Sequence, residues 1–423
     1  MQEDFLHYIW KHKSFDTSLL KTTKGESIAI ANLGQHNHNA GPDFFNAQIS
    51  IANQLWAGNV EIHIKSSDWY VHNHEVDRAY DNVILHVVWE HDTEIFRKDN
   101  SEIPTLELKH YVDKSLVNNY QKLMQSKSWI NCETSFSELD DFLLYNWLER
   151  LYIERLERKS EEIQYLLNSS HNNWEAVLFK MLTKNFGLKV NGESFLSLAH
   201  SFKFSIVRKL QKDILDLEAL FFGQAKLLND DVQEAYYLNL QKRYQFLKQK
   251  FKLTHQGVLP LQFFRLRPSN FPTVRLSQLA MLYYVNTSLF SEIITAKTKE
   301  DVYNLFNIET SEFWKSHYTF SKKSKTSKKA LSKSFIDLLI INTIIPLQFS
   351  YAKVQGKPIE DHVFDFMKQM NAEKNSIVSK FLDLKPIEKT ALTSQALLQL
   401  KQNYCDKNKC LQCAIGNRLI VKY

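Results

Sequence analysis

The pattern of apolar and polar residues changes its period once along this chain. Up to about residue 112, apolar residues recur mostly at every second position, as in β-strands, and from residue 113 onward they follow the 3.6-residue period of helices. The first part predicts an amphipathic helix over 2–13 and strands over 27–33, 44–52, 55–65, 83–89 and 103–108. The polar stretch 66–82 begins with Ser-Ser-Asp and predicts a helix between the third and fourth strands.

The second part predicts a succession of helices, over 142–167, 173–186, 191–200, 205–222, 230–252, 275–295, 299–306, 331–349, 359–370 and 374–382. We therefore predict an α+β chain, in which an α/β domain over 1–112 precedes a large all-α domain over 113–400. A C-terminal tail over 401–423 carries three of the four cysteines.

Composition narrows the class of protein. The 423 residues are 44% hydrophobic, enough for a globular core, and a net charge of +6 permits an anionic partner such as nucleic acid without requiring one. The longest apolar run, 335–349, is interrupted by Asp337, Asn342 and Pro346, so it predicts a buried helix and no membrane span. We expect a cytoplasmic protein, because the N-terminus lacks a secretory pattern and four cysteines are too few for a disulfide scaffold. The sequence leaves the oligomeric state open.

Two acidic residues of the predicted sheet are candidates for metal binding. Asp43 opens one predicted strand and Glu61 lies late on the next, so a hairpin can bring the two carboxylates together. His63 and Lys65 share the face of Glu61, because side chains two apart on a strand point the same way. Two carboxylates with a third polar group can hold Mg2+ or Mn2+, which orients and activates water for attack on a phosphodiester. The alternative is structural, because Asp after Pro is common in turns and a strand Glu is often only solvated.

These residues resemble the motif of the PD-(D/E)XK nuclease superfamily, whose core is a helix, three strands, a helix and a strand. Asp43 matches the Asp of the second strand, and Glu61 matches the Glu of the third. His63 stands where that motif has Lys, and Lys65 is a possible substitute on the same face. Some relatives instead carry a downstream His, which His72 or His74 would match. The resemblance implies a metal-dependent nuclease whose water is activated by one of these groups.

Nearly the whole chain also resembles an uncharacterised bacterial domain-of-unknown-function family. The motifs that carry this second resemblance are Gly41-Pro42-Asp43-Phe44, Val60-Glu61-Ile62-His63, Ser67-Asp68-Trp69, His72, His74, Leu85-His86-Val87-Val88, Arg267-Pro268-Ser269-Asn270-Phe271-Pro272 and Cys410-Leu411-Gln412-Cys413. The resemblance indicates membership of a family and implies no function.

Histidines are concentrated in the same region. Seven of the 15 lie between His36 and His91. Neutral imidazole is a common ligand of zinc, manganese and iron, and it can also serve as a general acid or base. We predict that His63 and His74 belong to the site and keep His72 and His86 as alternatives.

The cysteines predict a second metal site. Cys405, Cys410 and Cys413 form C-x4-C-x2-C, and Cys132 lies far upstream. Thiolates at such spacing bind Zn2+ tetrahedrally or hold an iron–sulfur cluster. One upstream and three C-terminal cysteines are similar to the arrangement in PD-(D/E)XK nucleases that hold an iron–sulfur cluster, although the spacing differs. His110 can replace Cys132 as the fourth ligand, and buried free thiols are the structural alternative.

A dense basic segment precedes one predicted helix. Arg265, Arg267 and Arg275 flank two prolines and an aromatic residue, and Thr273 is a candidate cap of the helix. Guanidinium groups beside a helix N-terminus suit phosphate, so we predict that these arginines contact nucleic acid. The alternative is a structural corner in which the arginines pair with acidic helices.

The chemistry of these residues favours a metal-dependent nuclease or another nucleic-acid-processing protein. Two alternatives remain open. One is a module of the same fold that binds nucleic acid or protein without catalysis, and the other is a histidine–carboxylate metallohydrolase of a small molecule.

Overall fold

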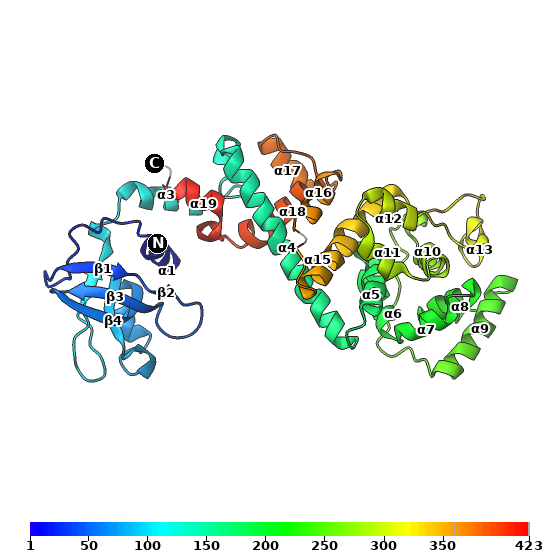
Figure 1. Cartoon of the computed structure of the whole chain (residues 1–423), viewed down its shortest axis with the longest axis horizontal. Helices are drawn as coiled ribbons and strands as arrows, with labels where there is room; N and C mark the ends of the chain where they lie inside the picture. Colours follow the sequence, from blue (N-terminus) through cyan, green and yellow to red (C-terminus); the bar gives the residue numbers. More distant parts are fainter. Residues whose placement is uncertain (359, 422–423) are drawn as a thin grey trace. The chain divides into compact units, whose positions relative to one another are not determined.

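A computed structural model describes residues 1–358 and 360–421, which form two compact units (Figure 1). The first unit comprises Met1–Trp147, Phe381–Lys385 and Gln399–Tyr423, and the second comprises Leu148–Lys380 and Pro386–Leu398. The predicted domains had their boundaries elsewhere, at residues 112 and 400. Position 359, the first residue of one predicted helix, lies outside the described residues.

The first unit contains the strands and the helices at both ends of the chain. Its elements are α1 (Glu3–Lys11), β1 (Ile28–Asn32), β2 (Gln35–His36), β3 (Phe44–Ile51), β4 (Gln54–Lys65), α2 (Asp68–Val71), η1 (Arg78–Tyr80), β5 (Val83–Glu90), β6 (Thr105–Glu107), η2 (Leu108–His110), α3 (Lys114–Met124), η3 (Glu133–Glu138), η6 (Lys401–Cys405), η7 (Cys410–Gln412) and α19 (Ala414–Val421). The predicted order of helix, three strands, helix and strand is present as α1, β1, β3, β4, α2 and β5.

The sheet is mixed, and β4 is its central strand. Its strand order is β1-β3-β4-β5-β6, and the short β2 pairs with β3. The β1–β3 and β3–β4 pairs are antiparallel, whereas β4–β5 and β5–β6 are parallel. The β3–β4 register shifts between Phe44 and Ala47, where Asn46 has a φ of 57°. A bulge at the start of β3 therefore lies directly beside Asp43.

Strand alternation separates a structural face of β4 from a chemical one. Val60 and Ile62 are fully buried in a core that also contains Phe5, Ile9 and Trp10 of the amphipathic helix α1. Because neighbouring side chains on a strand point to opposite faces, Glu61 and His63 lie on the other face of β4. There a second apolar cluster is formed by Trp69, Tyr80, Val83, Ile95 and Ile103.

The last segment of the chain belongs to this same core. Leu116 and Tyr120 of α3 and Ile420 of α19 are buried with the residues of α1. Asn119 Nδ2 donates a hydrogen bond of 3.3 Å to the carbonyl of Ile420. The period of the hydrophobic pattern changes at residue 113, but the core that α3 helps to bury is still that of the sheet. This is why the first unit extends to Trp147 and includes the predicted tail.

The second unit is helical except for one small hairpin. Helix α4 (Asp141–Ser169) begins in the first unit and is followed by α5 (Trp174–Phe186), α6 (Leu188–His200), α7 (Phe204–Leu210), α8 (Ile214–Gln224), α9 (Ala235–Phe251), η4 (Pro268–Asn270), α10 (Pro272–Val285), α11 (Leu289–Thr295), α12 (Lys299–Leu305), α13 (Glu312–Lys315), β7 (His317–Thr319), β8 (Lys322–Lys323), α14 (Lys333–Leu339), η5 (Ile340–Ile344), α15 (Ile345–Val354), α16 (Glu360–Lys368), α17 (Ser376–Leu384) and α18 (Ala391–Leu400). The predicted helices 205–222 and 275–295 are each two helices. In the first case Asp213 breaks the helix, because its side chain caps α8 by accepting the Leu215 N–H.

The longest apolar stretch forms a core helix. Lys333–Val354 is, within the described parts of the chain, the one helical stretch long and apolar enough to cross a membrane by length and composition. In its most apolar window, 78% of the residues are buried inside the protein. That burial agrees with the predicted buried helix.

Candidate active site

The pairing of β3 with β4 brings Asp43 and Glu61 together. The backbone N–H of Asp43 donates to Glu61 Oε2 at 3.1 Å, and the backbone N–H of Ile62 donates to Asp43 Oδ2 at 3.0 Å. Each carboxylate therefore reaches the backbone of the opposite strand. The approach that the sequence predicted for this hairpin is present.

Glu61 is a buried carboxylate with few groups to stabilise its charge. Its side chain is 6% exposed. Burial raises the pKa of Glu61 well above its usual value, and the negative charge of Asp43 raises it further, although the Asp43 N–H acts in the opposite direction. The basic groups in contact with its Oε1 atom are imidazoles, with His74 Nε2 at 3.3 Å and His63 Nε2 at 3.5 Å.

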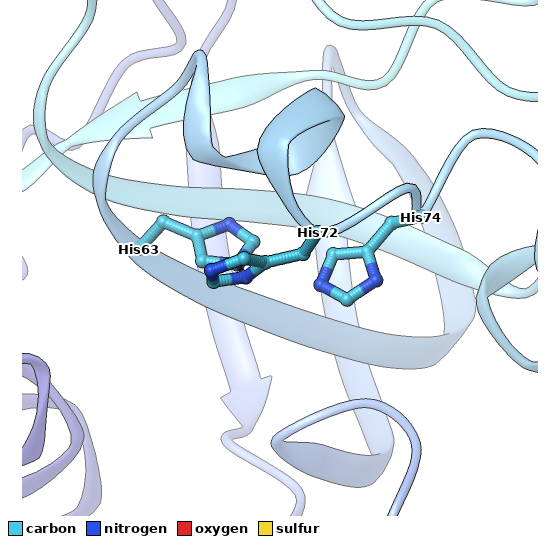
Figure 2. A group of neighbouring side chains, drawn as sticks. All are labelled: His63, His72 and His74. Atoms are coloured by element: carbon cyan, nitrogen blue, oxygen red, sulfur yellow. Dashed lines mark hydrogen bonds between the residues drawn. The ribbon is translucent and has the colours of Figure 1, made fainter.

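Three histidines face a common point beside Glu61. The ligand nitrogens of His63, His72 and His74 all lie within 4.8 Å of one another, and His63 Nε2 is 3.1 Å from His72 Nδ1. His63 projects from β4, whereas His72 and His74 come from the turn after α2, which carries them over the strand (Figure 2). Of the three imidazoles, His63 is buried, His74 is half-buried and His72 is exposed.

Neighbouring rings fix the orientation of these imidazoles. His63 Nδ1 is 2.8 Å from Nε2 of the fully buried His86, so the opposite nitrogen of His63 is directed at Glu61 and His72. The ring of His74 stacks on Tyr80, with centroids 3.8 Å apart. The pKa of His63 is lowered to about 3, mainly by burial and also by the nearby His74 and His72. His63 is therefore neutral near pH 7 and can offer a lone pair.

His7 is a residue of the site that sequence reasoning missed. It projects from α1, and its Nε2 is 3.1 Å from Asp43 Oδ2. Burial alone would lower the pKa of His7, but the Asp43 carboxylate outweighs it and the net shift is upward. The i,i+4 spacing of Glu3 and His7 on one face of the predicted N-terminal helix was the available signal, but nothing in the sequence paired that face with Asp43.

A groove of about 1450 Å³ reaches the site at His7. Its basic lining consists of His7, Lys11, His12, His36, His38, Lys407 and Lys409. Asp4 is the acidic residue among the lining side chains. Its three lysines make the groove a cationic surface within the first unit.

The comparison with protein families places most of this chain in one family. A family model described as protein of unknown function, DUF2851, matches residues 3–376. The chain belongs to the DUF2851 family. No curated protein and no solved structure gave a significant match. The residues that the DUF2851 model matches include Asp43, Glu61 and the three histidines, and they end before Cys405.

Lys65 does not join the candidate site. It is the last residue of β4 and is exposed. Its charge acts on Asp92: burial raises the pKa of that carboxyl, but hydrogen bonds from Ser67 and Ser66 and the charge of Lys65 give a net lowering. Lys65 shares a strand face with Glu61, as predicted, but it lies at the exposed end of the strand and interacts with Asp92.

The predicted arginine cluster divides into exposed and buried members. Arg265 and Arg267 are exposed. Arg275 is only 6% exposed, donates to Asn270 Oδ1 at 2.6 Å and Gln278 Oε1 at 3.0 Å, and stacks over Phe335 at 3.7 Å. Two of its guanidinium nitrogens are hydrogen-bonded inside the helical unit and its Nε is buried without a hydrogen-bond partner among the described residues, so the predicted phosphate contact does not fit Arg275.

Thr273, the candidate cap of the same helix, is also engaged elsewhere. Its Oγ1 donates to the carbonyl of Tyr318 at 2.6 Å, and Phe271 occupies the capping position.

The four predicted metal-binding cysteines all lie in the first unit. Cys132, Cys405 and Cys410 are partly buried and Cys413 is buried, and all four are free thiols. His110, the alternative fourth ligand, instead contacts Glu107 Oε2 at 3.2 Å through its Nε2.

Proposed function

We propose that the first unit is a metal-dependent nuclease, a hydrolase of the phosphodiester bonds of nucleic acid. The observation that carries the proposal is the reciprocal hydrogen bonding of Asp43 and Glu61 across β3 and β4, beside three converging imidazoles. The order of helices and strands around these residues agrees with the resemblance to PD-(D/E)XK nucleases. Both acidic positions of that motif are therefore in one place, although His63 replaces its lysine.

The donor set fits a divalent cation. Glu61 Oε1 lies 3.3 Å from His74 Nε2 and 3.5 Å from His63 Nε2, distances close to the spacing of ligands around an ion with bonds of about 2.0–2.2 Å. Glu61 and Asp43, with His63, His72 and His74, are the residues that would hold it. A bound cation would supply charge neutralisation and an activated water at neutral pH. Imidazole donors favour Mn2+ over Mg2+, so Mn2+ is the better candidate of the two.

The protein's own groups have separate tasks in this proposal. His63 is held neutral by burial and oriented by His86, so its Nε2 atom is directed toward the place that the cation would occupy. His7 lines the groove and contacts Asp43, which favours its protonated form. A protonated imidazole at this position can donate a hydrogen bond to a phosphate oxygen or a proton to the leaving oxygen. His7 is therefore our candidate general acid.

The cationic groove supports a nucleic acid as the partner. Lys11, Lys407 and Lys409 supply fixed positive charge along its wall, and Asp4 is the one acidic lining residue. Polyanion binding by such a surface releases counterions, so its affinity should fall steeply as salt increases. A small neutral substrate would make no use of these lysines.

A cleavage assay tests the proposal. Labelled single-stranded and double-stranded DNA and RNA are incubated with the full chain and Mn2+ or Mg2+, and Asp43→Asn and Glu61→Gln are compared with Glu90→Gln. Glu90 is an exposed acidic residue at the end of β5 and serves as the matched control. We expect cleavage by the wild type and by Glu90→Gln, and its loss in the two site variants.

The other outcomes identify the alternatives. Salt-sensitive binding of nucleic acid without cleavage would indicate a binding module that has lost the chemistry. Metal-dependent hydrolysis of a small ester, with no binding of either polymer, would indicate a small-molecule metallohydrolase. Cleavage that survives in both site variants would refute the assignment of Asp43 and Glu61.

A further inference from the structure

Four thiols from two distant parts of the sequence gather in the first unit. Cys132 precedes η3, whereas Cys405, Cys410 and Cys413 lie near the C-terminus. Cys132 and Cys410 both pack against the core of the first unit. Asn131, the neighbour of Cys132, donates from its Nδ2 to Cys410 Sγ at 3.4 Å. The upstream Cys132 and the C-terminal Cys410 are therefore brought to the same part of the first unit.

The C-terminal cysteines are held in a tight turn before α19. The N–H of Cys413 donates to the carbonyl of Cys410 at 3.2 Å, which closes the C-x2-C segment. The sulfur of Cys413 accepts from the N–H groups of Ile415 and Gly416, as a capping group does at the start of a helix. A Cβ at Gly416 would lie 2.1 Å from the carbonyl oxygen of Cys410, so the turn can approach the helix only because residue 416 is glycine.

Backbone N–H groups that point at sulfur favour the thiolate, but the surroundings of these thiols oppose it. Burial is the main cause that raises the pKa of Cys132 to about 12, and the nearby Cys413 and Cys410 contribute to this rise. Burial likewise raises the pKa of Cys405, with contributions from Cys132, Cys413 and Cys410. Each of these two thiols therefore lies within electrostatic range of other cysteines of the set, which is the proximity that a shared metal centre requires.

We propose that Cys132, Cys405, Cys410 and Cys413 together bind one thiolate-ligated metal centre, a zinc ion or an iron–sulfur cluster, which fastens the C-terminal segment to the first unit. Four thiolates are the donor set of both kinds of centre. The role is structural, because the full set of ligands comes from the protein and leaves no open position for a substrate. The proposal does not depend on nuclease activity.

The spacing of the sulfurs bears on which centre is bound. In the described residues, the one group of three or more His, Cys, Asp or Glu ligand atoms within 4.8 Å of one another is His63, His72 and His74. The thiols are therefore spaced more widely than the roughly 3.8 Å that a single tetrahedral ion with metal–sulfur bonds of about 2.3 Å imposes. A zinc ion would therefore require the thiols to move closer together, whereas an iron–sulfur cluster separates its thiolate ligands more widely.

Elemental analysis and spectroscopy of the purified full chain distinguish a zinc ion from an iron–sulfur cluster. Zinc predicts about one equivalent of zinc per chain, no visible colour, and a tetrahedral thiolate spectrum after replacement by Co2+. An iron–sulfur cluster predicts iron with acid-labile sulfide and broad absorption near 400 nm in anaerobically purified protein. Folded protein that contains neither metal, and that binds neither Co2+ nor reconstituted iron and sulfide, overturns the proposal.

Substitutions assign the metal to these residues. Cys410→Ser and Cys413→Ser should each lose at least nine-tenths of the metal, whereas Asp43→Asn and Glu61→Gln should retain it. Metal retained in the cysteine variants, or lost only in Asp43→Asn and Glu61→Gln, would contradict the assignment. If the cysteine variants do not fold, titration of the native wild type with a mercurial replaces them. It should release the metal in step with the modification of four thiols, and thiols that titrate without releasing metal would refute the proposal.

Discussion

Glu218 offers a test of the physical reasoning that is independent of any activity. It lies on α8 with a side chain that is fully buried, and its carboxylate accepts hydrogen bonds from Tyr236 at 2.6 Å, Ser277 at 2.7 Å and Ser311 at 2.8 Å. These donors belong to α9, to α10 and to the start of α13. One carboxyl group therefore connects four elements of the helical unit, and its protonation should be visible in the stability of that unit.

The magnitude follows from the pKa of Glu218. Burial raises this pKa from 4.5 to about 7, even though the three hydroxyl donors act to lower it. The folded state therefore binds the proton more tightly than the unfolded state. The stabilising contribution is complete below about pH 4.5 and is lost as the pH rises to about 7. Linkage gives a loss of about 2.5 kcal/mol between pH 5 and pH 8.

The assay compares the wild type with Glu218→Gln, which resembles the protonated acid and does not titrate. Unfolding of the helical unit is followed by hydrogen exchange of peptides from α8 and α9 at several values of pH, with the exposed Glu300→Gln as control. The free energy of unfolding of the wild type, relative to Glu218→Gln, should fall by about 2.5 kcal/mol from pH 5 to pH 8. A difference that is independent of pH, or one that also appears with Glu300→Gln, would refute the reasoning.

Three further predictions concern other positions. Burial and the charge of Asp43 raise the pKa of Glu61, so a cation that binds this carboxylate must displace a proton near neutral pH. The affinity of the wild type for Mn2+, measured by calorimetry, should therefore rise up to about tenfold per pH unit. The rise should be much smaller in Glu61→Gln. In Gly223→Ala the new Cβ would lie 2.1 Å from the ring of Tyr244, so the free energy of unfolding should fall by about 1–3 kcal/mol, measured in urea. Arg275→Ala should lower stability by about 2–4 kcal/mol without changing nucleic-acid affinity in a filter-binding assay, whereas Arg267→Ala should leave stability unchanged.

Strand alternation was sufficient to predict the centre of the candidate site. Val60 and Ile62 are apolar while Glu61 and His63 are polar, and this pattern alone fixes which side chains share a face of β4. The positions of Asp43 and Glu61 on consecutive strands then predicted that they meet. Lys65 shows the limit of the same rule, because alternation gives the face of a side chain but not whether the strand end remains over the site.

Contacts that depend on tertiary packing could not be predicted in this way. His7 approaches Asp43 because α1 packs on the sheet at a particular angle, which no local pattern encodes. Arg275 appeared to be a surface residue because the sequence does not show that Phe335, Asn270 and Gln278 enclose it. The boundary predicted at residue 112 differs from the limit of the first unit for a related reason: a helical period identifies α3 as a helix but does not say which core buries it.

Glu61 and Glu218, both buried in the described part of the chain, differ in the groups that surround the carboxyl. Glu218 has three hydroxyl donors, so its environment satisfies the carboxylate and gives it a structural role. Glu61 receives one backbone N–H, and its other oxygen faces the nitrogens of His63 and His74, of which His63 is neutral near pH 7. A buried carboxylate beside a second carboxylate and neutral imidazoles is costly unless a proton or a cation neutralises it, and the raised pKa of Glu61 indicates that a proton does so when no cation is bound. This contrast with Glu218 supports the proposal that Glu61 binds a metal ion.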